Sequence, residues 1–217
     1  MNNMQQVIHQ NSATVAYIRQ HDYPSALESS ASVLLLLQHL DTTPSGTTST
    51  IPSPLDCLDQ CMLLSEVDTT SNDRANRKTA FVYEQGILLP PTATEYTMVS
   101  AVVIFNSALA HQLFAQQQQD KDASQRYLLM SRRLYGLAYG VHSRACHSML
   151  FQFVVINNMA VIDQQTGNPE QSTQYFKHLM TVLLLMVDQG CTSRLRHLRG
   201  FTRNVPSSAE SQAAAAA

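Results

Sequence analysis

Two cysteines of this chain have a spacing that could contribute to a metal site. Cys57 and Cys61 are four residues apart, so a helix would bring their side chains together. A zinc site needs two more ligands, and the nearest pair, Cys146 and His147, is adjacent, so on a helix its side chains point about 100° apart. We therefore interpret the four cysteines, of which Cys191 is the last, as reduced buried thiols, and we expect no metal and no cofactor.

The eight histidines are scattered along the chain and do not suggest a reaction. No HExxH, GxSxG, Walker A or GxGxxG pattern occurs. Asp163 could be a buried functional carboxylate, but we favour an exposed or hydrogen-bonded one. We expect a protein that is not an enzyme. An unrecognised hydrolase or metal enzyme remains an alternative, which metal analysis of the purified protein would test.

A run of basic residues near the C-terminus is the strongest local charge feature. Its members are Arg194, Arg196, His197, Arg199 and Arg203. With no acid among them, they could bind phosphate, RNA or an acidic partner, although Phe201 is the only aromatic residue between them. We favour a solvated helix face, and we keep nucleic-acid or phosphate binding through residues 194–203 as the alternative function.

The composition is poor in charge. Of 217 residues, 14% are charged, against about 25% in an average soluble protein, and the formal net charge is −2. This balance makes nucleic acid an unlikely partner for the chain as a whole. The N-terminus lacks the pattern of a secretory signal, and the apolar runs 33–37 and 182–187 are shorter than the ~20 residues of a membrane span. We expect a cytoplasmic or nuclear protein that does not bind membranes.

Helical periodicity dominates the chain and predicts the elements that must position any site. Asp22 is a candidate N-cap, and residues 92–95 have the T-x-x-E form of a capping box. Gly167 is a natural helix stop, with Pro169 at the first position of the next helix. The predicted helices cover residues 3–20, 23–40, a helix from the capping box to 117, 122–141, 146–165 and 169–189.

The remaining segments are polar or short. Residues 41–78 predict a largely flexible insertion, with a possible short helix over 55–65. Residues 80–89 are rich in aromatic and branched side chains, but a lone strand is marginal in water, so we expect an extended segment packed on helices. We expect one helical domain over residues 1–205 and a disordered tail over 206–217.

One spacing of small and packing residues recurs in consecutive helix pairs. Intervals of 3, 4, 5, 4 and 3 separate Ala160, Asp163, Gly167, Ser172, Phe176 and Leu179. The same intervals separate Thr14, Tyr17, His21, Ala26, Ser30 and Val33. The middle pair repeats parts of the pattern with Ala108, His111, Ser131, Tyr135 and Ala138. A small residue on each helix lets the pair approach closely, and a large residue one turn later fills the space towards the next pair.

This spacing resembles the tetratricopeptide repeat (TPR). Ala160 stands at that family's small position, Gly167 at its inter-helix turn and Phe176 at its packing aromatic. Asp163 and His111 depart from the usual aromatic residue. The stretches 102–113, 156–168, 175–190 and 198–205 are similar to an uncharacterised family of TPR-like proteins of diatoms, for which we know of no established activity. The resemblance implies an all-α, irregular TPR-like solenoid of about three helix pairs, with a long loop insertion and one short extended segment.

The resemblance also implies a binding surface. In TPR proteins, the position two residues before the small residue of the first helix faces the concave groove. Asn106 and Asn158 hold this position, and Ser12 is its equivalent in the first pair. An asparagine there can donate to and accept from the backbone of an extended peptide. The candidate peptide-binding residues are Ser12, Asn106, Gln112, Asn157, Asn158 and Gln164. The alternative is a set of solvated polar positions on amphipathic helices.

The groove lacks the basic residues of a carboxylate clamp, because Val154 and Asn158 stand where TPR proteins that bind a C-terminal carboxylate place them. We therefore expect a non-enzymatic protein–protein interaction module, a scaffold whose partner is an extended peptide or a helix on the concave face. The sequence leaves the oligomeric state open.

Overall fold

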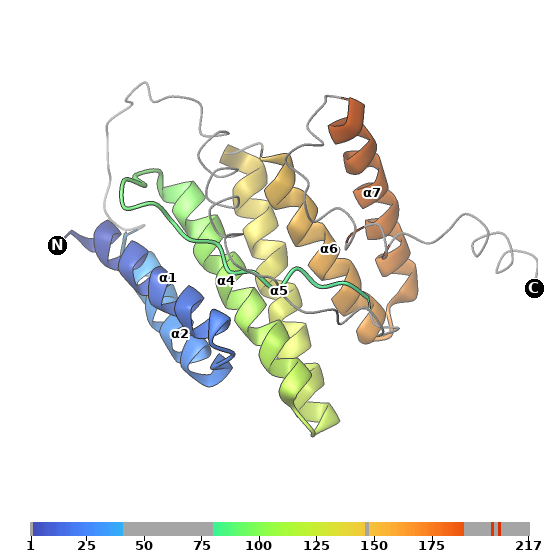
Figure 1. Cartoon of the computed structure of the whole chain (residues 1–217), viewed down its shortest axis with the longest axis horizontal. Coiled ribbons are helices and arrows are strands. Elements are labelled where there is room, and N and C mark those ends of the chain that lie inside the picture. The colour runs from blue at the N-terminus through green and yellow to red at the C-terminus, as the bar shows by residue number, and fades with distance from the viewer. Residues whose placement is uncertain (1, 41–79, 146–147, 189–200, 202–203, 205–217) are drawn as a thin grey trace, which may run out of the picture. The chain divides into compact units, whose positions relative to one another are not determined.

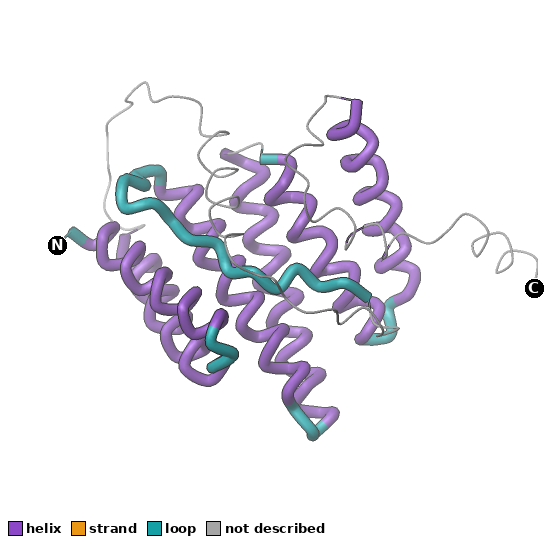
Figure 2. Tube along the Cα trace, viewed as in Figure 1, coloured by secondary structure: helices purple, strands orange, loops and turns teal. Residues whose placement is uncertain are grey.

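The computed structural model describes residues 2–40, 80–145, 148–188, 201 and 204, and all regular structure among them is helical (Figures 1 and 2). The chain divides into two compact units, residues 1–69 with 84–155 and residues 70–83 with 156–217. The predictions for residues 41–78, for the basic run and for the tail lie outside the described residues, as do all four cysteines. The single domain over 1–205 stays a prediction.

The first helix pair of unit 1 consists of α1 (Asn3–Arg19) and α2 (Tyr23–Leu40). Each buries the residues that recur every three or four positions, and the two helices pack together. The hydroxyl groups of Thr14 and Ser29 meet across the pair at 2.9 Å. The Asp22 carboxylate accepts a hydrogen bond of 3.2 Å from the main-chain N–H of Ser25, which confirms its capping role.

Helix α4 (Tyr96–Gln117) is the central helix of unit 1 and packs on α1, α2 and α5. It is apolar around most of its circumference, so most of its residues are buried. Among the described helices it alone is long and apolar enough to cross a membrane, and 83% of that apolar window is buried inside the structure. This burial is what a core helix requires.

Helix α5 (Lys121–Ala145) is amphipathic and pairs with α4. Its buried face carries the predicted packing residues Ser131, Tyr135 and Ala138. The Ser131 hydroxyl donates a hydrogen bond of 2.7 Å to the main-chain oxygen of Ala108. The two small positions of the repeat spacing therefore meet, as the sequence predicts.

The third pair begins with α6 (Met149–Gln165), which starts in unit 1 and continues in unit 2 from Ile156. In unit 2 it is followed by α7 (Pro169–Asp188). Gly167 adopts a φ of 82° between them, a left-handed conformation that favours glycine. The packing residues of this pair are buried, as predicted: Ala160, Ser172, Phe176 and Leu179.

The predicted starts of two helices are wrong. The capping box at Thr92 is not formed, because the turn after Pro90 continues to Ala93, whose N–H donates to the Pro90 oxygen. Glu95 is instead the N-cap of α4, and its carboxylate accepts from the N–H of Met98. Helix α6 starts at Met149 rather than at residue 146, with the Ser148 hydroxyl accepting from the N–H of Phe151.

Candidate functional site: asparagine side chains on an extended segment

Residues 80–89, hereafter the extended segment, contain neither helix nor strand (Figure 2). The main-chain groups of Phe81, Tyr83 and Ile87 bond to asparagine side chains. Phe81 and Tyr83 belong to unit 2, and Ile87 belongs to unit 1. In each unit, asparagine amides thus satisfy main-chain groups of the segment where a sheet would use a neighbouring strand. The extended packing that the sequence predicts is confirmed.

Unit 1 contains the first amide site, formed by Asn106 of α4 and Asn11 of α1. Asn106 Oδ1 accepts from the N–H of Ile87 at 2.8 Å, and its Nδ2 donates to the oxygen of the same residue at 2.8 Å. Asn106 Nδ2 also donates to Asn11 Oδ1 at 2.8 Å, and Asn11 Nδ2 donates to the Ile87 oxygen at 3.2 Å. The amide of Asn106 therefore bonds Ile87 as the main chain of a paired strand would.

The first amide site is closed to solvent. Asn11, Asn106 and Ile87 are each 0% exposed, so every polar group there depends on a protein partner. The neighbouring Gly86 is also buried, and a Cβ at this position would lie 3.1 Å from the Val15 Cγ2 atom. The missing side chain of Gly86 is what lets the extended segment approach α1 closely.

Unit 2 contains the second amide site, centred on Asn158 of α6. Asn158 Oδ1 accepts from the N–H of Tyr83 at 2.9 Å, and its Nδ2 donates to the Tyr83 oxygen at 3.0 Å. Two further asparagines complete the site. Asn204 accepts from the N–H of Phe81 and donates to its oxygen, both at 2.7 Å, and Asn157 donates to the same oxygen at 3.1 Å.

Aromatic side chains accompany the second amide site. The ring of Phe201 meets that of Phe81 edge to face, with centroids 4.9 Å apart, and stacks on that of Tyr83 at 6.2 Å. Phe201 and Asn204 are both buried. Phe201 adds an aromatic contact, and Asn204 adds an amide that makes two hydrogen bonds, to the contacts from α6.

Asn106 and Asn158 occupy equivalent positions of the repeat spacing, two residues before Ala108 and Ala160. Each makes the same pair of hydrogen bonds to one residue of an extended backbone. The sequence predicts an amide at this position that holds an extended peptide. The peptide present here belongs to the chain itself.

The other predicted peptide-binding residues are placed differently. Asn157 joins the second amide site, whereas the Ser12 hydroxyl donates to the Ile8 oxygen of its own helix. Gln112 is buried and accepts from the Tyr135 hydroxyl at 3.0 Å, between α4 and α5. Gln164 is exposed on α6.

Sequence reasoning missed Asn11 and Asn204. Asn11 directly precedes Ser12, so a shift of one residue in the assumed equivalence of the first pair would have found it. Asn204 does not fall at a position of the repeat spacing that the other asparagines share. Its bonds to Phe81 span 123 residues of sequence, so no local pattern points to it.

The titratable groups of the described residues do not gather into a centre. No cluster of three or more histidine, cysteine, aspartate or glutamate side chains that could hold a metal ion is found among them. His111 is half-buried and donates from Nδ1 to the Ser107 oxygen at 2.8 Å. Burial lowers the pKa of His111 from its ordinary value, and the bond to Ser107 raises it in opposition.

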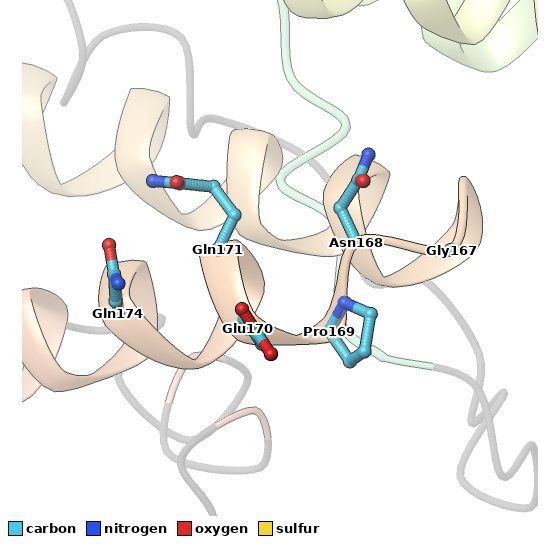
Figure 3. Close-up of a pocket in the computed structure, with 6 residues that line it drawn as sticks. All are labelled: Gly167, Asn168, Pro169, Glu170, Gln171 and Gln174. Atoms are coloured by element: carbon cyan, nitrogen blue, oxygen red, sulfur yellow. The ribbon is translucent and has the colours of Figure 1, made fainter.

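A surface hollow of about 330 Å³ lies at the turn into α7 of unit 2 (Figure 3). Its lining residues are exposed and spread along the turn and the first part of the helix, rather than converging on one point. They are Gly167, Asn168, Pro169, Glu170, Gln171 and Gln174. The hollow therefore lacks the enclosed, convergent groups of a small-molecule site.

Comparison with protein-family models, with curated proteins and with solved structures found no match to this chain.

Proposed function

We propose that this chain is a non-enzymatic, TPR-like interaction module that binds the backbone of an extended partner peptide. The binding groups are asparagines on the first helix of a helix pair, Asn106 on α4 and Asn158 on α6. The observation that carries the proposal is the pair of two-bond contacts that Asn106 and Asn158 each make to one extended residue. Main-chain hydrogen bonds supply affinity in this mode, and the flanking side chains supply specificity.

The chemistry of the site sets the expected salt dependence. Asparagine amides are neutral, so their bonds to a peptide backbone do not depend on charge screening. Binding of a partner peptide should change little between low and high salt. A phosphate-driven mode would instead weaken steeply as salt rises.

The test is selection of peptides from a displayed random library on the full-length chain, followed by affinity measurement with variants. Asn158→Ala should weaken the selected peptides at least tenfold, which is about 1.4 kcal/mol. Gln165→Ala is the matched control, because Gln165 is an exposed amide on the same helix. It should leave the affinity unchanged.

A second readout does not depend on the folding of a variant. A selected peptide that carries a photoreactive group should cross-link to α4 or α6 of the wild-type chain, as mapped by mass spectrometry. Cross-links confined to other helices, or equal affinity of folded Asn158→Ala and wild type, would overturn the proposal.

A further inference from the structure

We infer that the extended segment is an internal ligand, so that a partner peptide binds the amide sites by displacing it. This inference rests on the proposed function. Its starting point is that the hydrogen-bonding groups of Asn106 and Asn158 already bond Ile87 and Tyr83. A partner that uses the same groups must replace those bonds.

The contacts of the extended segment can be reproduced by a separate peptide. The asparagine bonds to Phe81, Tyr83 and Ile87 go to main-chain atoms, which every peptide carries. The segment joins no sheet, so exchange does not disrupt a strand ladder. A peptide with matching side chains therefore competes on nearly equal terms, apart from the advantage that the internal ligand has by being covalently attached.

The internal ligand also indicates the chemistry of the partner. In unit 2, the rings of Phe81 and Tyr83 contact Phe201, which favours an aromatic residue at two alternate positions. In unit 1, the close approach to Val15 favours glycine, followed by a buried aliphatic residue such as Ile87. The partner is thus an extended, largely uncharged peptide that, like residues 80–89, carries both an aromatic-x-aromatic motif for unit 2 and a Gly-aliphatic motif for unit 1.

Attachment sets the size of the competition. A segment joined to its own site has an effective concentration in the millimolar range for a short flexible linker. The apparent affinity for a partner falls by the fraction of molecules in which the site is open. Weakening the internal ligand should therefore tighten binding of a partner that carries the intact motif.

The probe for the test is a fluorescein-labelled synthetic peptide with the sequence of residues 80–89, AFVYEQGILL. Its affinity is measured by fluorescence anisotropy with three full-length chains. Tyr83→Leu removes the aromatic stacking on Phe201 and should bind the probe at least tenfold more tightly than wild type. Glu84→Gln is the matched control, because Glu84 is exposed in the same segment, and it should behave as wild type.

Two further arms separate the possible failures. Adding Asn158→Ala to Tyr83→Leu should abolish the gain, and circular dichroism checks the folding of both variants. Equal affinity of wild type and folded Tyr83→Leu would overturn the inference. Use of the same site is also tested in the wild type, where the probe should compete with a library-selected peptide. Selected peptides that bind the amide sites without such competition would overturn the inference of an internal ligand but would leave the proposed function standing. Cross-links away from α4 and α6 would overturn the proposed function itself.

Discussion

Replacement of Asn106 by alanine tests how much the first amide site stabilises the fold. The substitution removes the acceptor of the Ile87 N–H and the donor to Asn11 Oδ1, both in a region that is 0% exposed. The Ile87 oxygen keeps its bond from Asn11 Nδ2. Two buried polar groups are thus left without their bonds, and each such loss costs roughly 1–3 kcal/mol.

We therefore expect Asn106→Ala to lower the free energy of unfolding by roughly 2–6 kcal/mol. This is a large part of the 5–15 kcal/mol of an average domain, in round terms. The assay is urea unfolding followed by circular dichroism. The control is Ser12→Ala, which removes a hydroxyl that bonds only its own helix and should change stability by no more than about 0.5 kcal/mol.

Asn106→Asp adds a test of the direction of these bonds. The new carboxylate can still accept from the Ile87 N–H, but when ionised it has no donor for the Ile87 oxygen. Its folded-state pKa should be raised, so its stability should be retained at acid pH and lost as pH rises through that pKa. Equal stability of Asn106→Ala and Ser12→Ala, or no pH dependence of Asn106→Asp relative to wild type, would refute the reasoning.

Three further substitutions probe other parts of the structure. Gly86→Ala should destabilise the fold by roughly 1–3 kcal/mol, because its Cβ would lie 3.1 Å from Val15, and the side chain of Val15 is 0% exposed and has little room to move. In urea unfolding, the double substitution with Val15→Ala should cost less than the sum of the two single substitutions. An additive cycle would exclude the contact. Burial lowers the pKa of His111 in the folded chain below its ordinary value of 6.5, so the unfolded chain takes up this proton at a higher pH than the folded chain does. The stability that depends on neutral His111 is therefore full above pH 6.5 and is lost as the pH falls. Acid titration of stability should therefore be shallower for His111→Gln than for wild type or for His9→Gln on the exposed face of α1, and equal slopes would contradict the assignment. Ser131→Leu should lower the melting temperature far more than Ser131→Ala, because the α4–α5 approach leaves no room for a larger side chain, and similar melting temperatures would show that the two helices do not need a small residue there.

Much of the fold follows from the sequence because its causes are local. The helix period, the glycine at 167 and the Asp22 cap depend on residues within a few positions of one another, and each is found as predicted. The small residues Ala108 and Ser131 also carry local information, because each lies on a buried helix face that the pattern identifies. The predicted start of α4 is wrong because a turn after Pro90 forms in place of the capping box. A motif match alone does not compare the stability of the turn with that of the capping box.

The candidate site could be predicted only in part. The position of Asn106 and Asn158 in the repeat spacing predicts that they bind a partner peptide, and in the structure both bond to an extended backbone of the chain itself. That this backbone is the chain's own segment depends on bonds across 19 and 75 residues, which no local pattern encodes. Asn204 lies further still, since its bonds to Phe81 span 123 residues. Long-range pairing of this kind depends on the whole packed structure rather than on propensity.

Amide hydrogen exchange of the 15N-labelled full-length chain tests the central claim most directly. The N–H groups of Tyr83 and Ile87 donate to buried asparagines, so both should exchange slowly in the free protein. Saturation with the unlabelled peptide AFVYEQGILL should accelerate exchange at both positions while the amides of the central helix α4 stay protected. Unchanged slow exchange of Tyr83 and Ile87 in the presence of bound peptide would contradict displacement of an internal ligand.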